Sequence, residues 1–499
     1  MAGWQVFWVP QQGSTPRGEH PVLKRWTELE EREEAARIDP GDPFMLDPDW
    51  RADARLTRYF TRSRFARLSP ETKRNYVTDY RVFFDFLWQR GKCWSDATAE
   101  DLLDWEDWRR WSPRNERRIG PDKWNRELAA LTKLYGWAVD ACCIPSSPVT
   151  TREAISRNGD RVQVPAARAR NARGSNVKWL TPAAFRLWRD VGLRGYGADG
   201  RRDRSWRGRH DDRNAAFADL LFSSGLRRSE AGTLLTFELP SVEDTPRRYY
   251  AGRLGAEATK SRRVRTFYVA ADALLAIDAY CTTTRRAAIR RAQRHRRYDR
   301  VEGMLVLTGR SGFKQSVLHW HDQRGREHRR GLATLSHQER LRLFVDGDEG
   351  LEPLALWLSE DGTPFAPHSW EAVFHAASVR CQSILADHVA EPPFMTPHMA
   401  RHSFALHMLV ALHHAMDRRF GLDPEERRDH RLLYGDVWQM VKDLLGHSSV
   451  ETTRSIYLAP VSDLQVRSLL MEDVDTDTGE LLRLIAAASD RVLDAEECA

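Results

Sequence analysis

The apolar periodicity of this sequence breaks off between residues 151 and 178. Arginine, alanine and asparagine dominate the segment, and few apolar residues recur there at helical or strand spacing. Such a composition is typical of a linker. The 499 residues also exceed the usual size of one domain. The sequence therefore predicts two folded units joined by an Arg-rich linker over residues 151–178.

The part before the linker divides into an arm and a helical domain. Residues 1–54 are rich in proline, glycine and glutamate, and they predict an irregular N-terminal arm. Helix signals then begin, such as an N-cap at Ser69 followed by proline, and Gly91 closes the apolar stripe that follows. Further amphipathic stretches continue to Pro148. We expect a small all-helical domain over residues 55–150.

The part after the linker predicts a second, α-rich domain over residues 179–460. Most of its apolar residues recur at helical spacing. Around residues 249–269 the spacing changes to alternation, which indicates a short β-hairpin. The predicted fold class is mainly α with a small antiparallel β-sheet. Residues 461–499 contain an amphipathic stretch and predict a C-terminal tail or helix. The long stretch from 281 to 350 contains no pattern that indicates its role.

Composition narrows the classes of protein further. Hydrophobic residues make up 41% of the chain and charged residues 30%, which suits a globular protein with real cores. No apolar run is long enough to cross a bilayer and the N-terminus lacks a signal-peptide pattern, so we expect a cytoplasmic protein without a membrane partner. The six cysteines show no C-x-x-C pair, and we expect no metal site. A net charge of +6 and a pI near 9.0 are compatible with a polyanionic partner.

Four separated segments carry residue types suited to phosphoryl chemistry. They are Gly225-Leu-Arg-Arg-Ser-Glu230, Thr259-Lys-Ser-Arg-Arg-Val264, Thr396-Pro-His-Met-Ala-Arg-His-Ser-Phe404 and Leu445-Gly-His-Ser-Ser-Val-Glu-Thr-Thr-Arg-Ser-Ile-Tyr457. In the first, Arg227 lies at a predicted helix start, where a guanidinium and backbone N–H groups can converge on an anion. Glu230 can orient that arginine. In the third, His398 and Arg401 are three residues apart and share a helical face.

Each segment taken singly also fits an ordinary structural explanation. An arginine at a helix start is usually a surface residue, a single histidine on a helix is more often structural, and a tyrosine near the C-terminus usually packs. The basic segment 285–300 fits a DNA-contacting surface and a solvated helix face equally well. His319, His321 and His328 lack the carboxylate or cysteine spacing of a metal site. Only the order and local contexts of the four segments together favour a catalytic explanation.

The ordered series G-L-R-x-S-E, K-x-R-x-V in a hairpin, H-x-x-R-H-S-F and L-G-H-S-S-x-x-T-T with a following tyrosine resembles the tyrosine recombinase, or phage integrase, family. The resemblance covers residues 220–460. The helical domain before the linker also resembles that family's SAM-like core-binding domain, including Trp137-Ala138 and Ile144-Pro145 near its end. The resemblance implies a two-domain, C-shaped clamp on duplex DNA.

The resemblance also implies how the motif residues divide the chemistry. Arg227 and Arg401 would bind the non-bridging oxygens of the scissile phosphate, and Glu230 would support the first arginine. His398 and His447 would assist by hydrogen bonding and proton management. Two fixed guanidinium groups suit this task independently of the family, because the transition state concentrates negative charge on those oxygens.

The remaining two roles fall to a nucleophile and an acid. By the resemblance, Tyr457 would attack phosphorus to give a 3′-phosphotyrosyl link, and Lys260 would protonate the departing 5′ oxygen. A tyrosine of ordinary pKa, near 10, is a poor nucleophile at neutral pH, and nearby arginines would favour its phenolate. A lysine whose pKa is lowered by neighbouring cations can act as the acid. Because the covalent link conserves the phosphoester bond energy, rejoining would need no ATP or other cofactor. No metal would be needed either, because the arginines and the lysine take its electrostatic role.

The family implies site-specific recombination of double-stranded DNA, as in integration or excision of a mobile element. Its members work as homotetramers on synapsed DNA, with accessory directionality or DNA-bending proteins as further partners. In the family a C-terminal helix commonly docks in trans on a neighbouring protomer; residues 461–499 are the candidate here, and packing of this helix on its own domain is the equal alternative. Two alternatives remain open: a type IB topoisomerase-like enzyme with the same residues, and a catalytically silent DNA-binding relative.

Overall fold

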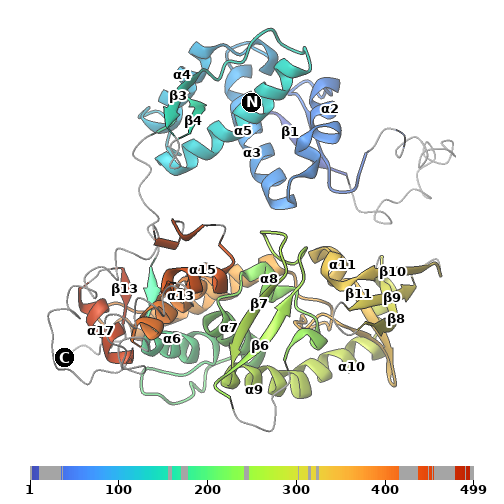
Figure 1. Ribbon diagram of the computed structural model, residues 1–499, viewed down its shortest axis with the longest axis vertical. Coiled ribbons are helices and arrows are strands. Elements are labelled where there is room, and N and C mark those ends of the chain that lie inside the picture. Colours follow the sequence, from blue (N-terminus) through green and yellow to red (C-terminus); the bar gives the residue numbers. More distant parts are fainter. Residues whose placement is uncertain are drawn as a thin grey trace. The chain divides into compact units, whose positions relative to one another are not determined.

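The structure is a computed structural model that describes residues 3–9, 35, 38–155, 160–169, 178–240, 247–301, 303–312, 316–321, 325–414, 436–447, 449–451, 453–454, 478–488 and 491–494. The chain separates into two compact units, residues 1–173 and residues 174–499. Figure 1 shows a smaller, mostly helical unit and a larger unit of helices with small sheets. Among the described residues, no helix is both long and apolar enough to cross a membrane.

The first unit is built on helices with clear local start signals. They are α2 (Ala54–Arg62), α3 (Pro70–Trp88), α4 (Ala99–Arg110) and α5 (Pro121–Asp140). The Ser69 side chain accepts a hydrogen bond from the Thr72 N–H at 3.2 Å, and Pro70 occupies the first turn of α3. Thr98 and Asp101 form a capping box at the start of α4. These signals involve near neighbours only, which is why the sequence predicts the helices.

The N-terminal residues contribute to this unit where the sequence predicts an irregular arm. β1 (Gln5–Trp8) pairs antiparallel with β2 (Pro43–Leu46). Trp4 is only 4% exposed, and its ring centroid lies 5.1 Å from that of Phe84. Its backbone N–H donates to Asp85 Oδ1 at 2.6 Å, across 81 positions of the sequence. The helical core therefore includes Trp4, through a long-range contact that no local pattern signals.

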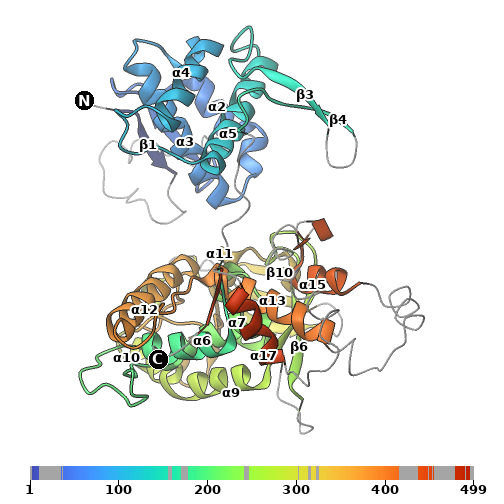
Figure 2. The ribbon, with the colours of Figure 1, turned by 90° about the vertical axis from the view of Figure 1, so that its left-hand side faces the viewer.

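The segment predicted as a linker begins with a β-hairpin that belongs to the first unit. β3 (Thr151–Ile155) pairs antiparallel with β4 (Arg161–Pro165), and Figure 2 shows the hairpin extending from the helices of this unit. After the hairpin, Trp124 Nε1 donates to the Ala167 carbonyl at 2.8 Å, and the Ala169 N–H donates to Asn125 Oδ1 at 2.9 Å. Helix α5 thus holds the chain as far as Ala169. The stretch that can act as a linker is shorter than predicted.

The second unit is also α-rich. Its helices are α6 (Pro182–Trp188), α7 (Asp211–Ser224), α8 (Arg228–Gly232), α9 (Ala271–Tyr280), α10 (Arg286–Arg294), α11 (His337–Arg340), α12 (Trp370–Leu385), α13 (Pro397–His414), α15 (Val437–Leu445) and α17 (Thr478–Ala488). Helix α7 is central and packs against α9, α13 and the hairpin strand β7 (Arg265–Ala270). On α7, the Phe217 ring stacks on Trp370 of α12 with centroids 3.6 Å apart. This core fixes the ends of α7 and α13, where the site lies.

The β-structure of the second unit is larger than predicted. The expected hairpin is present, because β6 (Tyr249–Leu254) pairs antiparallel with β7. The stretch 305–353 adds a five-stranded sheet in the order β10-β9-β8-β11-β12, in which β8 and β11 are parallel. Its strands are β8 (Leu305–Ser311), β9 (Val317–His321), β10 (Glu327–Gly331), β11 (Leu343–Gly347) and β12 (Gly350–Pro353). The sequence therefore predicts the hairpin but not the mixed sheet, since short strands rich in arginine, histidine and glycine give a weak alternating pattern.

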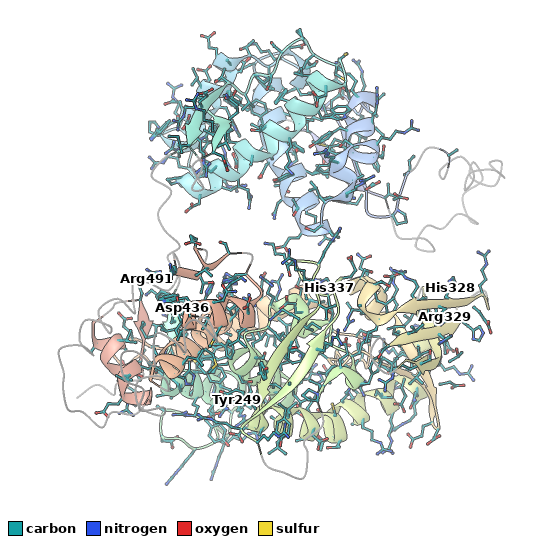
Figure 3. All side chains as sticks on the ribbon, viewed as in Figure 1. Tyr249, His328, Arg329, His337, Asp436 and Arg491 are labelled. Atoms are coloured by element: carbon teal, nitrogen blue, oxygen red, sulfur yellow. The ribbon has the colours of Figure 1, made fainter. Side chains whose placement is uncertain are left out.

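The C-terminal segment packs on its own unit. β13 (Val492–Leu493) pairs in parallel with β5 (Trp179–Leu180). Leu482 and Ile485 of α17 are buried in the same apolar cluster as Trp179 and Leu409. Arg491, labelled in Figure 3, lies over the Trp179 ring at 4.6 Å. The apolar face of α17 is thus covered by its own chain, whereas the family resemblance implies docking on a neighbouring protomer.

Candidate active site

The first motif lies where α7 ends and α8 begins. Gly225 follows α7 in the left-handed conformation, with φ of 62°. A Cβ atom on Gly225 would lie 2.3 Å from Cδ1 of Phe404 on α13, so the position requires glycine both for its backbone and for space. This close approach brings α7 and α13 together. Arg227 is the N-cap of α8, as the motif predicts.

Glu230 is the centre of a buried charge cluster. It is 1% exposed, and its carboxylate accepts hydrogen bonds from the Arg227 N–H at 2.8 Å and from Arg227 Nη1 at 2.9 Å. Arg265 Nη2 donates to Oε2 of the same carboxylate, the oxygen that also accepts from the Arg227 N–H. Burial by itself would raise the pKa of Glu230. The charges of Arg265, Arg401 and Arg227 outweigh burial and hold that pKa below its usual value.

Arg401 connects two helix ends. It is 1% exposed on α13, and its Nη1 donates to the Gly225 carbonyl at 2.6 Å. Its Nη2 donates to the carbonyl of Leu445, at the end of α15. The guanidinium is therefore held by the last turns of α7 and α15. Arg227 and Arg401 are brought together, because both charges act on the Glu230 carboxylate.

The two predicted histidines join this cluster in the neutral form. The His398 side chain reaches the surface, yet partial burial lowers the pKa of its ring. The charges of Arg401, Arg227 and Lys260 lower the pKa of the same ring further. Burial, followed by the charges of Arg401 and Arg227, lowers the pKa of His447 to about 3. Both imidazoles are thus uncharged at neutral pH, and each can donate one hydrogen bond and accept another.

Lys260 lies on the turn between β6 and β7. The Thr259 side chain organises this turn, because its hydroxyl donates to the Ala256 carbonyl and accepts from the Arg263 N–H at 3.1 Å. Lys260 itself is exposed. Its charge acts on the ring of His398, so the turn lies within electrostatic reach of the predicted site.

Sequence reasoning missed Arg265, which the structure adds to the cluster. Its side chain is only 8% exposed. Besides Glu230, it donates from Nη1 to the Leu444 carbonyl at 2.6 Å, just before the residue pair Gly446-His447. A signal was present in the sequence: Arg265 alternates with Phe267 and Val269, which face the core from β7. A charged residue on the buried face of a strand needs a partner.

The fourth motif is described only in part. His447 follows Gly446, which ends α15 in the left-handed conformation with φ of 65°. His447 Nδ1 lies 3.0 Å from Oγ1 of Thr453, a fully buried threonine of the same motif. This bond leaves Nε2 of His447 for another partner. The predicted nucleophile Tyr457 lies outside the described residues.

The arrangement suits a singly charged anion such as a phosphodiester. Arg227 and Arg265 bond to one buried carboxylate, and Arg401 bonds to two backbone carbonyls, so the positive charges outnumber the negative one, while the neighbouring histidines add no charge. Within the described ranges, no group of three or more histidine, cysteine, aspartate or glutamate side chains is placed to hold a metal ion. The groups that the site offers for chemistry are therefore guanidinium donors, neutral imidazoles and an exposed lysine.

Replacing Glu230 by glutamine is expected to destabilise the second unit by about 3 kcal/mol at neutral pH, because the buried arginines lose their counter-charge. The lowered pKa means that this stabilisation is complete above the unfolded pKa, about 4.3, and is lost as the pH falls through the folded pKa. The difference between wild type and variant should therefore be constant above about pH 5 and shrink at lower pH. Urea unfolding across this range measures it.

Glu349→Gln is the matched control, because Glu349 pairs with Arg290 at the surface, where both side chains are close to half exposed. It is expected to change the unfolding free energy by less than about 1 kcal/mol. An effect of Glu230→Gln no larger than that of the control would contradict the view that Glu230 compensates buried charge.

Residues 58–141 match the phage integrase N-terminal SAM-like domain. No curated protein sequence matches the chain significantly. Among solved structures, the Tn1549 transposon integrase in complex with circular intermediate DNA is 14% identical with a TM-score of 0.39, over 81% of this chain and 93% of that one. XerA recombinase is 15% identical with a TM-score of 0.30, over 84% of this chain and 98% of that one.

XerH recombinase bound to its difH substrate is 11% identical with a TM-score of 0.39, over 81% of this chain and 80% of that one. At these TM-scores the structural likeness carries no argument about function. The sequence match is specific to the helical unit that was expected to resemble a SAM-like core-binding domain. Residues 58–141 thus belong to the phage integrase N-terminal SAM-like domain family.

Proposed function

We propose that the chain is a site-specific DNA recombinase that cuts and rejoins strands through a 3′-phosphotyrosyl intermediate and a Holliday junction. The observation that carries the proposal is that Arg227 bonds to the buried Glu230 carboxylate while Arg401 bonds to the carbonyl of Gly225 in the same motif. The neutral imidazoles of His398 and His447 lie in the same cluster. The SAM-like domain supports a recombinase over a topoisomerase-like enzyme.

In this mechanism the two arginines bind the non-bridging oxygens of the scissile phosphate. Arg227 is 22% exposed at its side chain and can turn part of its fork toward DNA while Glu230 holds the rest. Arg401 is anchored to two backbone carbonyls, which fixes the plane of its guanidinium. Donors that are fixed in advance stabilise the negative charge of the pentacoordinate transition state without reorganisation.

Tyr457 and Lys260 then carry out the bond making and the proton transfer. The phenolate oxygen of Tyr457 attacks phosphorus, the bond from phosphorus to the 5′ oxygen breaks, and Lys260 gives its proton to that oxygen. His398 and His447 hydrogen-bond to the phosphate and help to move the proton of the phenol. Attack by the freed 5′ hydroxyl of a partner strand reverses the step, so neither ATP nor a metal enters the reaction.

The two units would grip a DNA duplex between them as a C-shaped clamp. Four copies on two synapsed sites would exchange one pair of strands after the other. The biological task would be integration or excision of a mobile element, with accessory directionality or DNA-bending proteins as partners, in the cytoplasm.

The test is covalent trapping on nicked suicide duplexes drawn from the DNA that flanks the gene. A nick beside the scissile phosphate lets a short fragment diffuse away, so the link to protein accumulates. We expect an adduct that survives denaturation, a free 5′ hydroxyl on the released fragment, and a nucleotide-bearing peptide that contains Tyr457 by mass spectrometry. Resolution of a synthetic Holliday junction then separates a recombinase from a topoisomerase-like enzyme. DNA binding without an adduct across a broad set of sites would favour a silent DNA-binding relative.

A further inference from the structure

The stretch 305–353, which contains the five-stranded sheet and α11 and is called the insertion below, touches the turn that carries Lys260. Between β10 and α11, a short helical turn (Leu332–Thr334) lies against Gly255, the first residue after β6. A Cβ atom on Gly255 would lie 2.7 Å from Cα of Ala333. Two residues further along the turn, the Glu257 N–H donates to the Ala333 carbonyl at 2.9 Å. The contact is between two backbones, so it leaves little freedom of position.

The chain just after Ala333 is anchored in an apolar cluster. The neighbouring Leu335 is fully buried in one apolar cluster with Trp320 of the inserted sheet and with Leu235. Leu235 closely follows α8, the helix that carries Glu230. The insertion is thus packed on the same part of the fold that positions the arginine cluster.

Polar contacts from α11 repeat this connection. His337, labelled in Figure 3, has its Nδ1 2.8 Å from Oγ1 of Thr233, the residue after α8. Buried Arg340 donates from Nε to the Thr233 carbonyl at 3.0 Å and pairs through Nη2 with buried Glu238. The negative charge of Glu230 also acts on the ring of His337. The insertion therefore links the end of α8 to the Lys260 turn.

We propose that the insertion is a positioning element for Lys260: it clamps the β6–β7 turn through Ala333 and so keeps the lysine within reach of the scissile phosphate. This inference rests on the proposed function. The physical reason is that an exposed hairpin turn is mobile by itself, whereas a general acid must stay within hydrogen-bond distance of the oxygen it protonates. Backbone contact at Gly255 and Glu257 restrains the turn on the strand side of Lys260, and Thr259 closes it locally.

The test is Gly255→Ala in the full chain, because the added methyl meets the Ala333 backbone and must displace the turn. The matched control is Gly331→Ala, in the same insertion, where a Cβ atom meets nothing within 4 Å. Cleavage is compared on two suicide duplexes, one with the natural bridging 5′ oxygen and one with sulfur in its place. A thiolate leaves without being protonated, since thiols have a pKa near 8.5, so the sulfur duplex does not need the acid.

We expect Gly255→Ala to cleave the oxygen duplex roughly 10- to 100-fold more slowly than wild type, which is part of the ~10²–10⁴-fold contribution of a positioned general acid. On the sulfur duplex its rate should equal that of wild type, and Gly331→Ala should match wild type on both. Unchanged cleavage of the oxygen duplex by Gly255→Ala would overturn the proposal. Equal slowing on both duplexes would also overturn it, because that result indicates damage to the whole site.

Amide hydrogen exchange separates this proposal from the proposed function. Residues 256–263 should exchange faster in Gly255→Ala than in wild type or Gly331→Ala. If wild type forms no adduct on either duplex, the proposed function fails, and exchange alone decides whether the insertion restrains the turn. Equal exchange in the three proteins would refute the restraint whatever the activity.

Discussion

Tyr457→Phe is expected to form no covalent adduct on any suicide duplex while binding DNA with unchanged affinity. The variant loses a single hydroxyl, which in the proposed mechanism is the only nucleophile. Phenylalanine keeps the ring, so folding and DNA contacts should persist. Arginines around the phosphate cannot replace the lost oxygen, because they stabilise charge but form no bond to phosphorus. The loss should therefore be complete within detection, the largest effect that we expect of any single change.

The measurement is adduct formation on denaturing gels, with binding followed in parallel by mobility shift. Tyr268→Phe is the matched control, since Tyr268 lies partly exposed on β7, at 43%, and has no role in the proposed chemistry. It should form adduct as wild type does. A persistent adduct in Tyr457→Phe would show that another residue is the nucleophile. Loss of DNA binding in the same variant would show that the substitution disrupts the structure rather than removing the nucleophile alone.

Arg401→Lys is expected to reduce the cleavage rate by about 10²–10³-fold, the usual effect of removing one fixed donor to a developing oxyanion. Lysine keeps the charge but cannot reach the Gly225 and Leu445 carbonyls at once, because an ammonium lacks the planar fork of a guanidinium. One or both carbonyls would lose a buried partner. We therefore also expect a loss of about 1–3 kcal/mol in unfolding free energy.

Single-turnover cleavage and urea unfolding measure the two effects separately. The matched control is Arg380→Lys, because Arg380 on α12 likewise donates to backbone carbonyls, of Val191 and Tyr196, but lies outside the site. The control should lose stability with little change in the cleavage rate at a temperature where it is folded. Equal rate losses in the two variants would show that Arg401 acts through folding alone.

The sequence predicts those parts of the fold that depend on near neighbours. Ser69, Thr98 and Gly225 mark helix boundaries through bonds or backbone conformations within a few residues. These boundaries can therefore be recognised from the sequence alone. The hairpin that carries Lys260 is likewise signalled by alternation along its own strands. The candidate site was assembled from motif order, and the structure brings Arg227, Glu230, His398, Arg401 and His447 together with Lys260 nearby.

Other features could be decided only by tertiary structure, because their cause lies far along the chain. Trp4 joins the first core through Asp85, and the strands of 305–353 pair with one another in one sheet. Arg265 is recognised as part of the candidate site only through its hydrogen bonds to Glu230 and to the Leu444 carbonyl. The contact of Ala333 with the Lys260 turn is between backbones, which carry no side-chain signal at all. Residue types and their order thus predicted the family resemblance and the candidate chemistry, whereas long-range packing decided which charges are paired and which backbone contacts the Lys260 turn.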